Sequence, residues 1–107
     1  MEKKVVKLNG QADDAQITKW KQEYKDGIYY IKSPTDIAYF REPMVFDVET
    51  AYAAADDDHP FASIKEFGRL TFIGGSEEIL KDDRMFLGAK TQLVKHWSGI
   101  KATSGNL

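Results

Sequence analysis

The spacing of apolar residues first indicates a helix near the start of the chain. From residue 14 to residue 24 apolar side chains recur at three- and four-residue intervals, which places them on one face of a helix. Asp13 precedes this run and is predicted to cap the helix, because a carboxylate accepts a hydrogen bond from a free backbone N–H. Trp20 lies on the apolar face, where we favour a core position over a second interpretation, an anchor for a partner protein.

Alternation of the β-strand type replaces the helical spacing after residue 27. Segments 28–32 and 37–41 are rich in β-branched and aromatic residues, as strands prefer. Residues 33–36, with the sequence SPTD, have the composition of a type I turn, so we predict an antiparallel hairpin. Successive side chains of a strand point to opposite faces, which separates Tyr29 from Tyr30.

The hairpin cannot be a complete fold. A two-stranded hairpin is marginal in water, so helices or another subunit must cover at least one of its faces. Its backbone edge would remain free, and such an edge is a natural place for self-association or for a strand from a partner. We therefore expect copies of the chain to associate through this edge.

Three longer helical patterns follow the hairpin, over residues 44–55, 60–72 and 83–97. Each pattern carries apolar residues at the spacing of a buried helix face. The residues predicted on these three faces are, in chain order, Val45, Val48, Tyr52, Ala55, Phe61, Ile64, Phe67, Leu70, Met85, Ala89, Leu93 and Trp97.

A glycine pair separates the second and third of these helices. Gly74-Gly75 is too short for a phosphate-binding loop, and the lysine–hydroxyl pair of the nucleotide motifs is absent. We interpret the pair as the C-cap of the preceding helix, in the left-handed conformation that glycine adopts readily. Ser76 is predicted to cap a short turn, and Asp82 to cap the last helix.

Together these elements predict an α+β fold, with one antiparallel β-hairpin packed against about four α-helices. At 107 residues the chain is long enough for one hydrophobic core, so residues 1–98 are expected to be a single globular domain. Within it, residues 1–12 are interpreted as an arm or a short strand around Val5 and Val6. Residues 99–107 are predicted to be a flexible C-terminal tail.

Composition excludes several classes of function. The chain has 15 Lys and Arg against 17 Asp and Glu, and a net charge of -2 does not support a general surface for nucleic acid. It has no cysteine, which excludes disulfides, thiolate metal sites and thiol nucleophiles. No apolar run is long enough for a membrane span or a secretory signal, so we expect a cytoplasmic protein.

The run Asp56-Asp57-Asp58-His59 is the best candidate for a metal site, because carboxylates and imidazole are ordinary metal ligands. A calcium loop, however, needs ligands at alternating positions, a glycine and a distal glutamate, and that pattern is absent. We therefore predict no metal site. The favoured interpretation is a solvated loop in which Asp58 or His59 caps a helix that begins at Pro60.

Catalysis has no specific support in the sequence. Glu77, Glu78, Asp82 and Asp83 could supply a general acid and base, but consecutive acids at helix starts are more often capping and solvation groups. His96 lies near the end of the last helix, where the helix dipole favours a cation. No serine lies in a nucleophile-elbow motif. We predict a protein that is not an enzyme and needs no cofactor.

One part of the chain resembles a known group of proteins. The stretches that carry the resemblance are Trp20-Lys21, Tyr29-Tyr30-Ile31, Ala38-Tyr39-Phe40-Arg41-Glu42-Pro43, Gly74-Gly75-Ser76-Glu77-Glu78-Ile79, Asp82-Asp83 and Phe86-Leu87. Their order over residues 17–97 resembles that of small phage and prophage proteins, the tail assembly chaperones. The resemblance implies binding to the tape-measure protein and recruitment of tail-tube subunits in the host cytoplasm. Its motifs are structural, so it supplies no catalytic residues.

The function predicted from the sequence is therefore protein binding in an assembly process. The side chains predicted to bind protein partners are Trp20, Tyr29, Tyr39, Glu77 and Glu78. One alternative is a structural virion component, such as a connector or tail-completion subunit. A further alternative is a small enzyme or enzyme regulator whose site has no recognisable motif.

Overall fold

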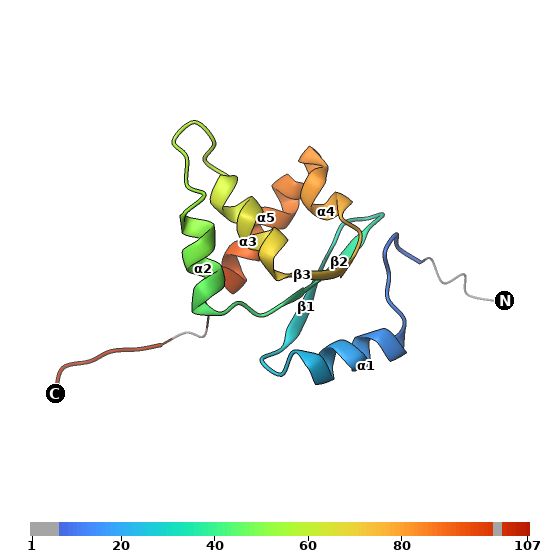
Figure 1. Ribbon diagram of the computed structural model, residues 1–107, viewed down its shortest axis with the longest axis horizontal. Coiled ribbons are helices and arrows are strands. Elements are labelled where there is room, and N and C mark those ends of the chain that lie inside the picture. Colours follow the sequence, from blue (N-terminus) through green and yellow to red (C-terminus); the bar gives the residue numbers. More distant parts are fainter. Residues whose placement is uncertain (1–6, 100–101) are drawn as a thin grey trace.

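A computed structural model describes residues 7–99 and 102–107, and it places a three-stranded sheet between helices (Figure 1). The elements in chain order are α1 (Asp14–Glu23), β1 (Ile28–Lys32), β2 (Ile37–Arg41), α2 (Val45–Tyr52), α3 (Ala62–Thr71), β3 (Phe72–Gly75), α4 (Glu78–Lys81) and α5 (Asp83–Trp97). The predicted α+β class is confirmed, with four longer helices and the single turn α4. The predicted strand around Val5 and Val6 lies outside the described residues.

The hairpin of β1 and β2 forms at the predicted residues. The two strands pair antiparallel from Ile28 opposite Arg41 to Lys32 opposite Ile37. In the connection between them, the Ser33 side chain accepts a hydrogen bond from the backbone N–H of Asp36 at 3.0 Å. Burial alternates along β1 as expected, because Tyr30 and Lys32 are exposed whereas Tyr29 is half-buried and Ile31 is buried.

The sheet has a third strand that the sequence analysis missed. Residues Phe72–Gly75 form β3 and pair antiparallel with β2, so the prediction of Gly74-Gly75 as a helix C-cap is wrong. Helix α3 ends at Thr71, and the chain turns directly into an extended conformation at Phe72. The Phe72 ring packs edge-on against Phe40 of β2, with ring centroids 5.8 Å apart. Strand β2 is therefore central, and β1 and β3 are the edges of the sheet.

One face of the sheet carries the hydrophobic core. Helices α3 and α5 pack on this face, and Figure 1 shows them on the side of the sheet opposite α1. Phe40, Phe67 and Leu93 are fully buried there. The buried core cluster consists of Ile31, Ala38, Phe40, Ala51, Phe67, Ile79, Phe86, Ala89 and Leu93. Its members come from β1, β2 and all helices except α1, so the described elements form one core.

Helix α1 covers the other face through one aromatic contact. Asp13 caps this helix as predicted, accepting a hydrogen bond from the backbone N–H of Gln16 at 2.8 Å. The ring of Trp20 packs against Tyr39 at 5.1 Å between centroids. It also lies over Gly74, where an added Cβ would be 2.5 Å from the ring. The indole can therefore pack on β3 because Gly74 has no side chain there.

Helix α5 begins as the sequence predicts, whereas the short turn α4 does not, because its N-cap is Glu77 and not Ser76. Ser76 accepts a hydrogen bond from the backbone N–H of Glu78 at 3.3 Å, at the start of the short turn α4. Asp82 caps α5 by accepting hydrogen bonds from the backbone N–H groups of Arg84 and Met85, both at 3.0 Å. Residues 102–107 form neither helix nor strand. Among the described residues, no helix has the length and apolar character needed to cross a membrane.

Candidate protein-binding surface

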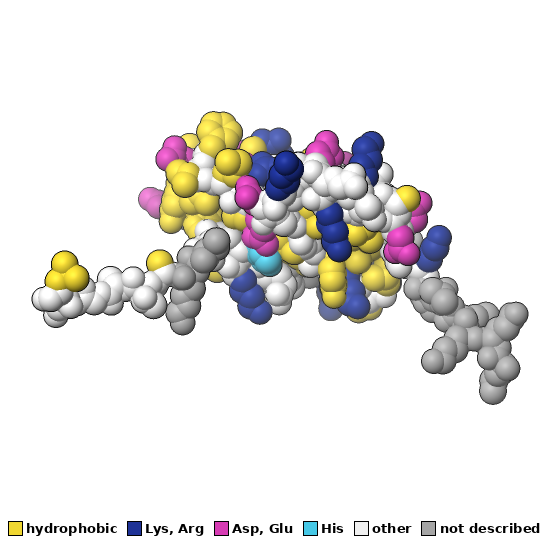
Figure 2. All heavy atoms as spheres, turned by 90° about the horizontal axis from the view of Figure 1, so that it is seen from below, with side chains coloured by type: hydrophobic (Ala, Val, Ile, Leu, Met, Phe, Trp, Pro, Cys, Tyr) yellow, Lys and Arg dark blue, Asp and Glu magenta, His cyan; other side chains and the backbone are white. Residues whose placement is uncertain are grey.

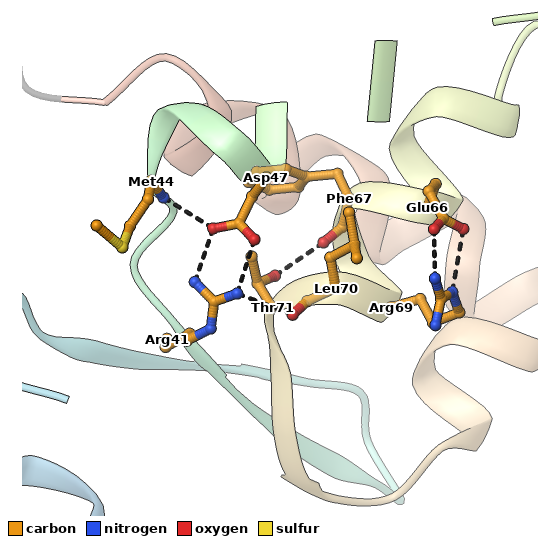
Figure 3. A network of polar contacts seen from close by, with 8 residues as sticks. All are labelled: Arg41, Met44, Asp47, Glu66, Phe67, Arg69, Leu70 and Thr71. Carbon is orange, nitrogen blue, oxygen red and sulfur yellow. Dashed lines mark hydrogen bonds and ion pairs between the residues drawn. The ribbon is translucent and has the colours of Figure 1, made fainter. Parts of the chain in front are cut away.

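The orientation of α2 depends on a buried ion pair at the end of β2. The Arg41 guanidinium donates two hydrogen bonds to the Asp47 carboxylate, each 2.7 Å long (Figure 3). It donates a third, at 3.1 Å, to the backbone carbonyl of Leu70 in α3. Asp47 also accepts from the backbone N–H of Met44 at 2.9 Å, where α2 begins. These bonds attach the first turn of α2 to both β2 and α3.

Asp47 therefore faces the interior, and the predicted burial of Val45 and Tyr52 in α2 is wrong, whereas Val48 packs against the core as predicted. The sequence pattern placed Val45 and Tyr52 on the buried face and Asp47 outside it, but the Asp47 residue is only 3% exposed. In an α-helix each residue turns by about 100°, so a helix that buries Asp47 turns Val45 and Tyr52 outward. The strong, doubly hydrogen-bonded pair decides the orientation over the apolar stripe.

A large apolar surface results. Met44, Val45, Phe46 and Tyr52 are 61%, 74%, 70% and 62% exposed, and we call these four residues the α2 apolar surface. Figure 2 shows hydrophobic side chains gathered at the end of the molecule where α2 lies in Figure 1. Three exposed large apolar side chains on so short a helix, with a fourth at its N-cap, are unusual for a surface that meets only water.

The segment that contains this surface, from Glu42 to Ile64, has six acidic residues and no lysine or arginine. Its exposed acidic side chains are Glu49, Asp56, Asp57 and Asp58. Its other two acids are paired within the fold, since Asp47 is buried against Arg41 and Glu42 contacts His96. On the helix itself, Glu49 is exposed and lies between Val45 and Phe46 around the helix axis. The α2 apolar surface is therefore an apolar patch with acidic neighbours.

The ion pair behind the surface also sets the protonation of Asp47. The hydrogen bonds from Arg41 hold the pKa of the Asp47 carboxyl below its usual value, and the bond from the Met44 N–H acts in the same direction. Asp47 is consequently ionised at neutral pH, so both partners of the pair are charged when α2 is attached.

The aromatic residues predicted to bind partners have intramolecular contacts. Trp20 and Tyr39 pack against each other, and the buried Tyr39 hydroxyl accepts a hydrogen bond from the Ala12 N–H at 3.1 Å. Tyr29 is half-buried on the opposite face of the sheet and stacks on the imidazole of His96, with ring centroids 3.5 Å apart. These three side chains therefore do not form one surface.

Tyr29, His96 and Glu42 lie together and have the residue types of a catalytic site. His96 contacts Glu42 at 2.8 Å between Nδ1 and Oε1. The Tyr29 hydroxyl is buried, and among the described residues it has no hydrogen-bond partner. Burial raises the pKa of this phenol, so it stays neutral and is a poor nucleophile. The cluster packs α5 against β1 and does not provide a nucleophile with its base.

The two predicted acidic residues lie at α4, on a different part of the molecule. Glu77 and Glu78 are exposed, and Glu77 pairs with Lys81 at 2.7 Å. Glu77 and Lys81 also line a cleft of about 380 Å³ together with Phe72 and Leu80. An exposed pair of this kind contributes little to stability, so both acids remain available to a partner.

The side chains of the acidic run before α3 contact residues of the same run. Asp56 contacts His59 at 2.8 Å between Oδ2 and Nδ1, and it accepts a hydrogen bond from the Asp58 N–H at 2.9 Å. Helix α3 begins at Ala62 without a side-chain cap, so the predicted capping by Asp58 or His59 is wrong. The described residues contain no group of three or more acidic, histidine or cysteine side chains placed to hold a metal ion.

Sequence reasoning missed the surface that the fold exposes. A usable signal was present, because Met44-Val45-Phe46 are three consecutive large apolar residues at the start of a helix. Consecutive helical residues point in different directions, so they cannot all face one core. At least one of the three had to lie on the surface.

Comparison with known proteins gives no relative from which a function could be taken. The scan of protein-family models, the search of curated proteins and the search of solved structures each returned no match.

Proposed function

We propose that the chain is a non-enzymatic assembly protein that binds another protein through the α2 apolar surface. The observation that carries this proposal is the exposure of Met44, Val45, Phe46 and Tyr52 on and directly before a helix that the Arg41–Asp47 ion pair holds in place. Rotating α2 to bury these side chains would remove Asp47 from Arg41 and leave charges unpaired, which is costly. The apolar face is therefore available without a conformational change.

The resemblance to tail assembly chaperones supplies the partner to test first. It implies that a tape-measure protein and tail-tube subunits are bound during assembly. A protein that exposes apolar side chains can cover apolar segments of such a partner until the partner assembles. A connector or tail-completion subunit would instead keep the same surface buried in the finished particle.

The test is direct binding with one variant and one control. We would measure the affinity of the purified chain for a tail-tube subunit and for overlapping fragments of a tape-measure protein encoded in the same genome. Phe46→Glu places a charge in the centre of the surface and should weaken binding by about 30-fold or more, as loss of an interface hot spot does. Thr18→Glu changes an exposed position of α1 and is the matched control.

Two results would contradict the proposal. The first is that neither the tail-tube subunit nor any tape-measure fragment binds the chain. The second is that the Phe46→Glu variant is folded and binds as tightly as the wild type. Binding only within purified mature particles, with none to the free tape-measure or tail-tube proteins, would favour the connector alternative.

A further inference from the structure

Two segments of the chain carry exposed charges of opposite sign. The segment from Glu42 to Ile64 has six acids and no lysine or arginine, as described above. The segment from Arg84 to Ser98, which is most of α5, has three lysines and arginines and no aspartate or glutamate. The near-neutral total of the chain conceals this separation.

The basic segment also exposes apolar side chains. Helix α5 buries Phe86, Ala89 and Leu93, so its opposite side faces outward. Leu87 and Val94 are 53% and 47% exposed on that outward side. We call the exposed side chains on this outward side the α5 basic face, and they are Arg84, Leu87, Thr91, Val94 and Lys95.

A depression lies beside this face. It has a volume of about 280 Å³ and is lined by Phe61 and Ile64 from the start of α3 and by Lys90, Thr91 and Val94 from α5. Lys90 extends over the ring of Phe61, 5.2 Å from its centroid. The depression thus combines apolar walls with a cation, the complement of an aromatic side chain beside an acid.

Gly88 leaves room for another molecule to approach α5 closely. It lies in the middle of an exposed helix, where glycine costs about 1 kcal/mol relative to alanine. An added Cβ at Gly88 would meet no atom of this chain within 4 Å, so no described contact within the fold requires glycine. A glycine on an exposed helix allows another backbone or side chain to approach the helix closely.

We propose that copies of this chain associate head to tail, with the α2 apolar surface of one copy packed against the α5 basic face of the next. Phe46 enters the depression between α3 and α5, and Glu49 lies opposite Arg84 and Lys95. This inference rests on the proposed function, since it identifies a second copy as one protein that the α2 apolar surface binds. A partner that uses the same surface competes with this association.

The two surfaces differ, and this fixes the kind of assembly. Each copy offers one α2 apolar surface and one α5 basic face, so it binds two neighbours through different contacts. Such heterologous contacts produce a ring if the rotation between copies closes, and an open filament if it does not. A symmetric dimer, by contrast, uses the same patch twice and stops at two copies.

Complementation between two variants tests the arrangement. Phe46→Glu disables the α2 apolar surface, and Val94→Glu disables the α5 basic face. In sedimentation velocity, the wild type should form species larger than dimers, and each variant alone should be monomeric. An equal mixture should form a one-to-one dimer and nothing larger, because one intact pair of surfaces remains. Thr91→Glu replaces Val94→Glu if the latter fails to fold, and Thr18→Glu should assemble as the wild type does.

Several outcomes would overturn the proposal. These are a wild-type chain that stays monomeric at high concentration, an assembly that stops at dimers, and two folded variants whose mixture does not dimerise. Gly88→Ala provides a separate readout, because it should stabilise the monomer and weaken association, and unchanged association would contradict close packing there. All of these measurements use the chain alone, so their failure is distinguishable from failure to bind a tail protein.

Discussion

At the scale of single residues, the pair of Arg41 and Asp47 has the largest structural consequence. Arg41 of β2 donates two hydrogen bonds of 2.7 Å to Asp47 of α2 and one of 3.1 Å to the Leu70 carbonyl of α3, and these bonds turn α2 so that apolar side chains face solvent. Asp47→Ala leaves the guanidinium without its carboxylate partner, and we expect the free energy of unfolding to fall by roughly 2–3 kcal/mol. This loss is smaller than that for a fully buried pair, because Arg41 is partly solvated. Urea denaturation at neutral pH measures this loss.

The same pair makes stability depend on pH. Hydrogen bonds from Arg41 lower the pKa of Asp47 in the folded state, so its contribution is fully present above the unfolded pKa of about 3.9. That contribution decreases as the pH falls through the lower folded-state pKa. The difference in stability between wild type and Asp47→Ala should therefore shrink in acid. The exposed Glu49→Gln variant is the control, and a difference that persists unchanged to pH 2 would contradict the assignment.

Gly74 is a second residue whose identity the fold requires. An added Cβ would lie 2.5 Å from the Trp20 ring, so Gly74→Ala should displace the indole and cost about 1–3 kcal/mol, as overpacking does. Tryptophan fluorescence and thermal unfolding measure the two effects. Gly88→Ala is the matched control, because it has open space and should instead stabilise the chain by about 1 kcal/mol. Equal effects of the two substitutions would contradict the packing of Trp20 on β3.

At the scale of elements, the connection between the hairpin and β3 depends on a buried carboxylate that pairs with no cation among the residues that the structure describes. Asp36 is 4% exposed and accepts hydrogen bonds from the hydroxyls of Ser76 and Thr35, each 2.6 Å long. These hydroxyls, with Ser76 making the larger contribution, lower the pKa of Asp36. The stabilisation is thus present above the usual aspartate pKa and is lost as the pH falls below it. The bond from Ser76, which directly follows β3, to Asp36 therefore holds the end of β3 to the hairpin.

Ser76→Ala should therefore loosen β3 without unfolding the domain. We expect a lower thermal midpoint and faster hydrogen exchange at the backbone N–H of Ser76, which donates to the Ile37 carbonyl at 2.8 Å. Ser98→Ala serves as control, since the Ser98 hydroxyl donates to the Val94 carbonyl in the preceding turn of its own helix. If hydrogen exchange in β3 is the same in both variants, the Asp36 contact does not hold the strand.

The elements differ in how far the sequence could predict them. The hairpin and the caps at Asp13 and Asp82 depend on neighbouring residues, and each was predicted at the right position. Strand β3 depends on pairing with β2, more than 30 positions earlier in the chain, and the glycines at its end suggested a helix stop. The face of α2 depends on Arg41, whose partner could not be identified from helical spacing alone. Local signals were therefore sufficient for elements but not for the contacts that create the candidate surface.

At the scale of the whole molecule, separated charges matter more than the net charge. The acidic neighbours of α2 and the cations of α5 favour the unlike surfaces of two copies over two like surfaces, because like charges placed together are repelled. Both surfaces are exposed, and salt screens such charges over about 10 Å at 0.1 M and about 3 Å at 1 M. Head-to-tail association should accordingly weaken as salt is added, although its apolar part remains.

A charge exchange separates this electrostatic contribution from nonspecific apolar contact. Glu49→Lys places a cation opposite Lys95, and Lys95→Glu places an acid opposite Glu49, so each single variant should associate about tenfold more weakly than the wild type. The double variant restores opposite charges at the same contact and should recover most of the lost affinity. Glu23→Lys, on exposed α1, controls for the change in net charge. If the double variant is no tighter than the two single variants, Glu49 and Lys95 do not face each other across the interface.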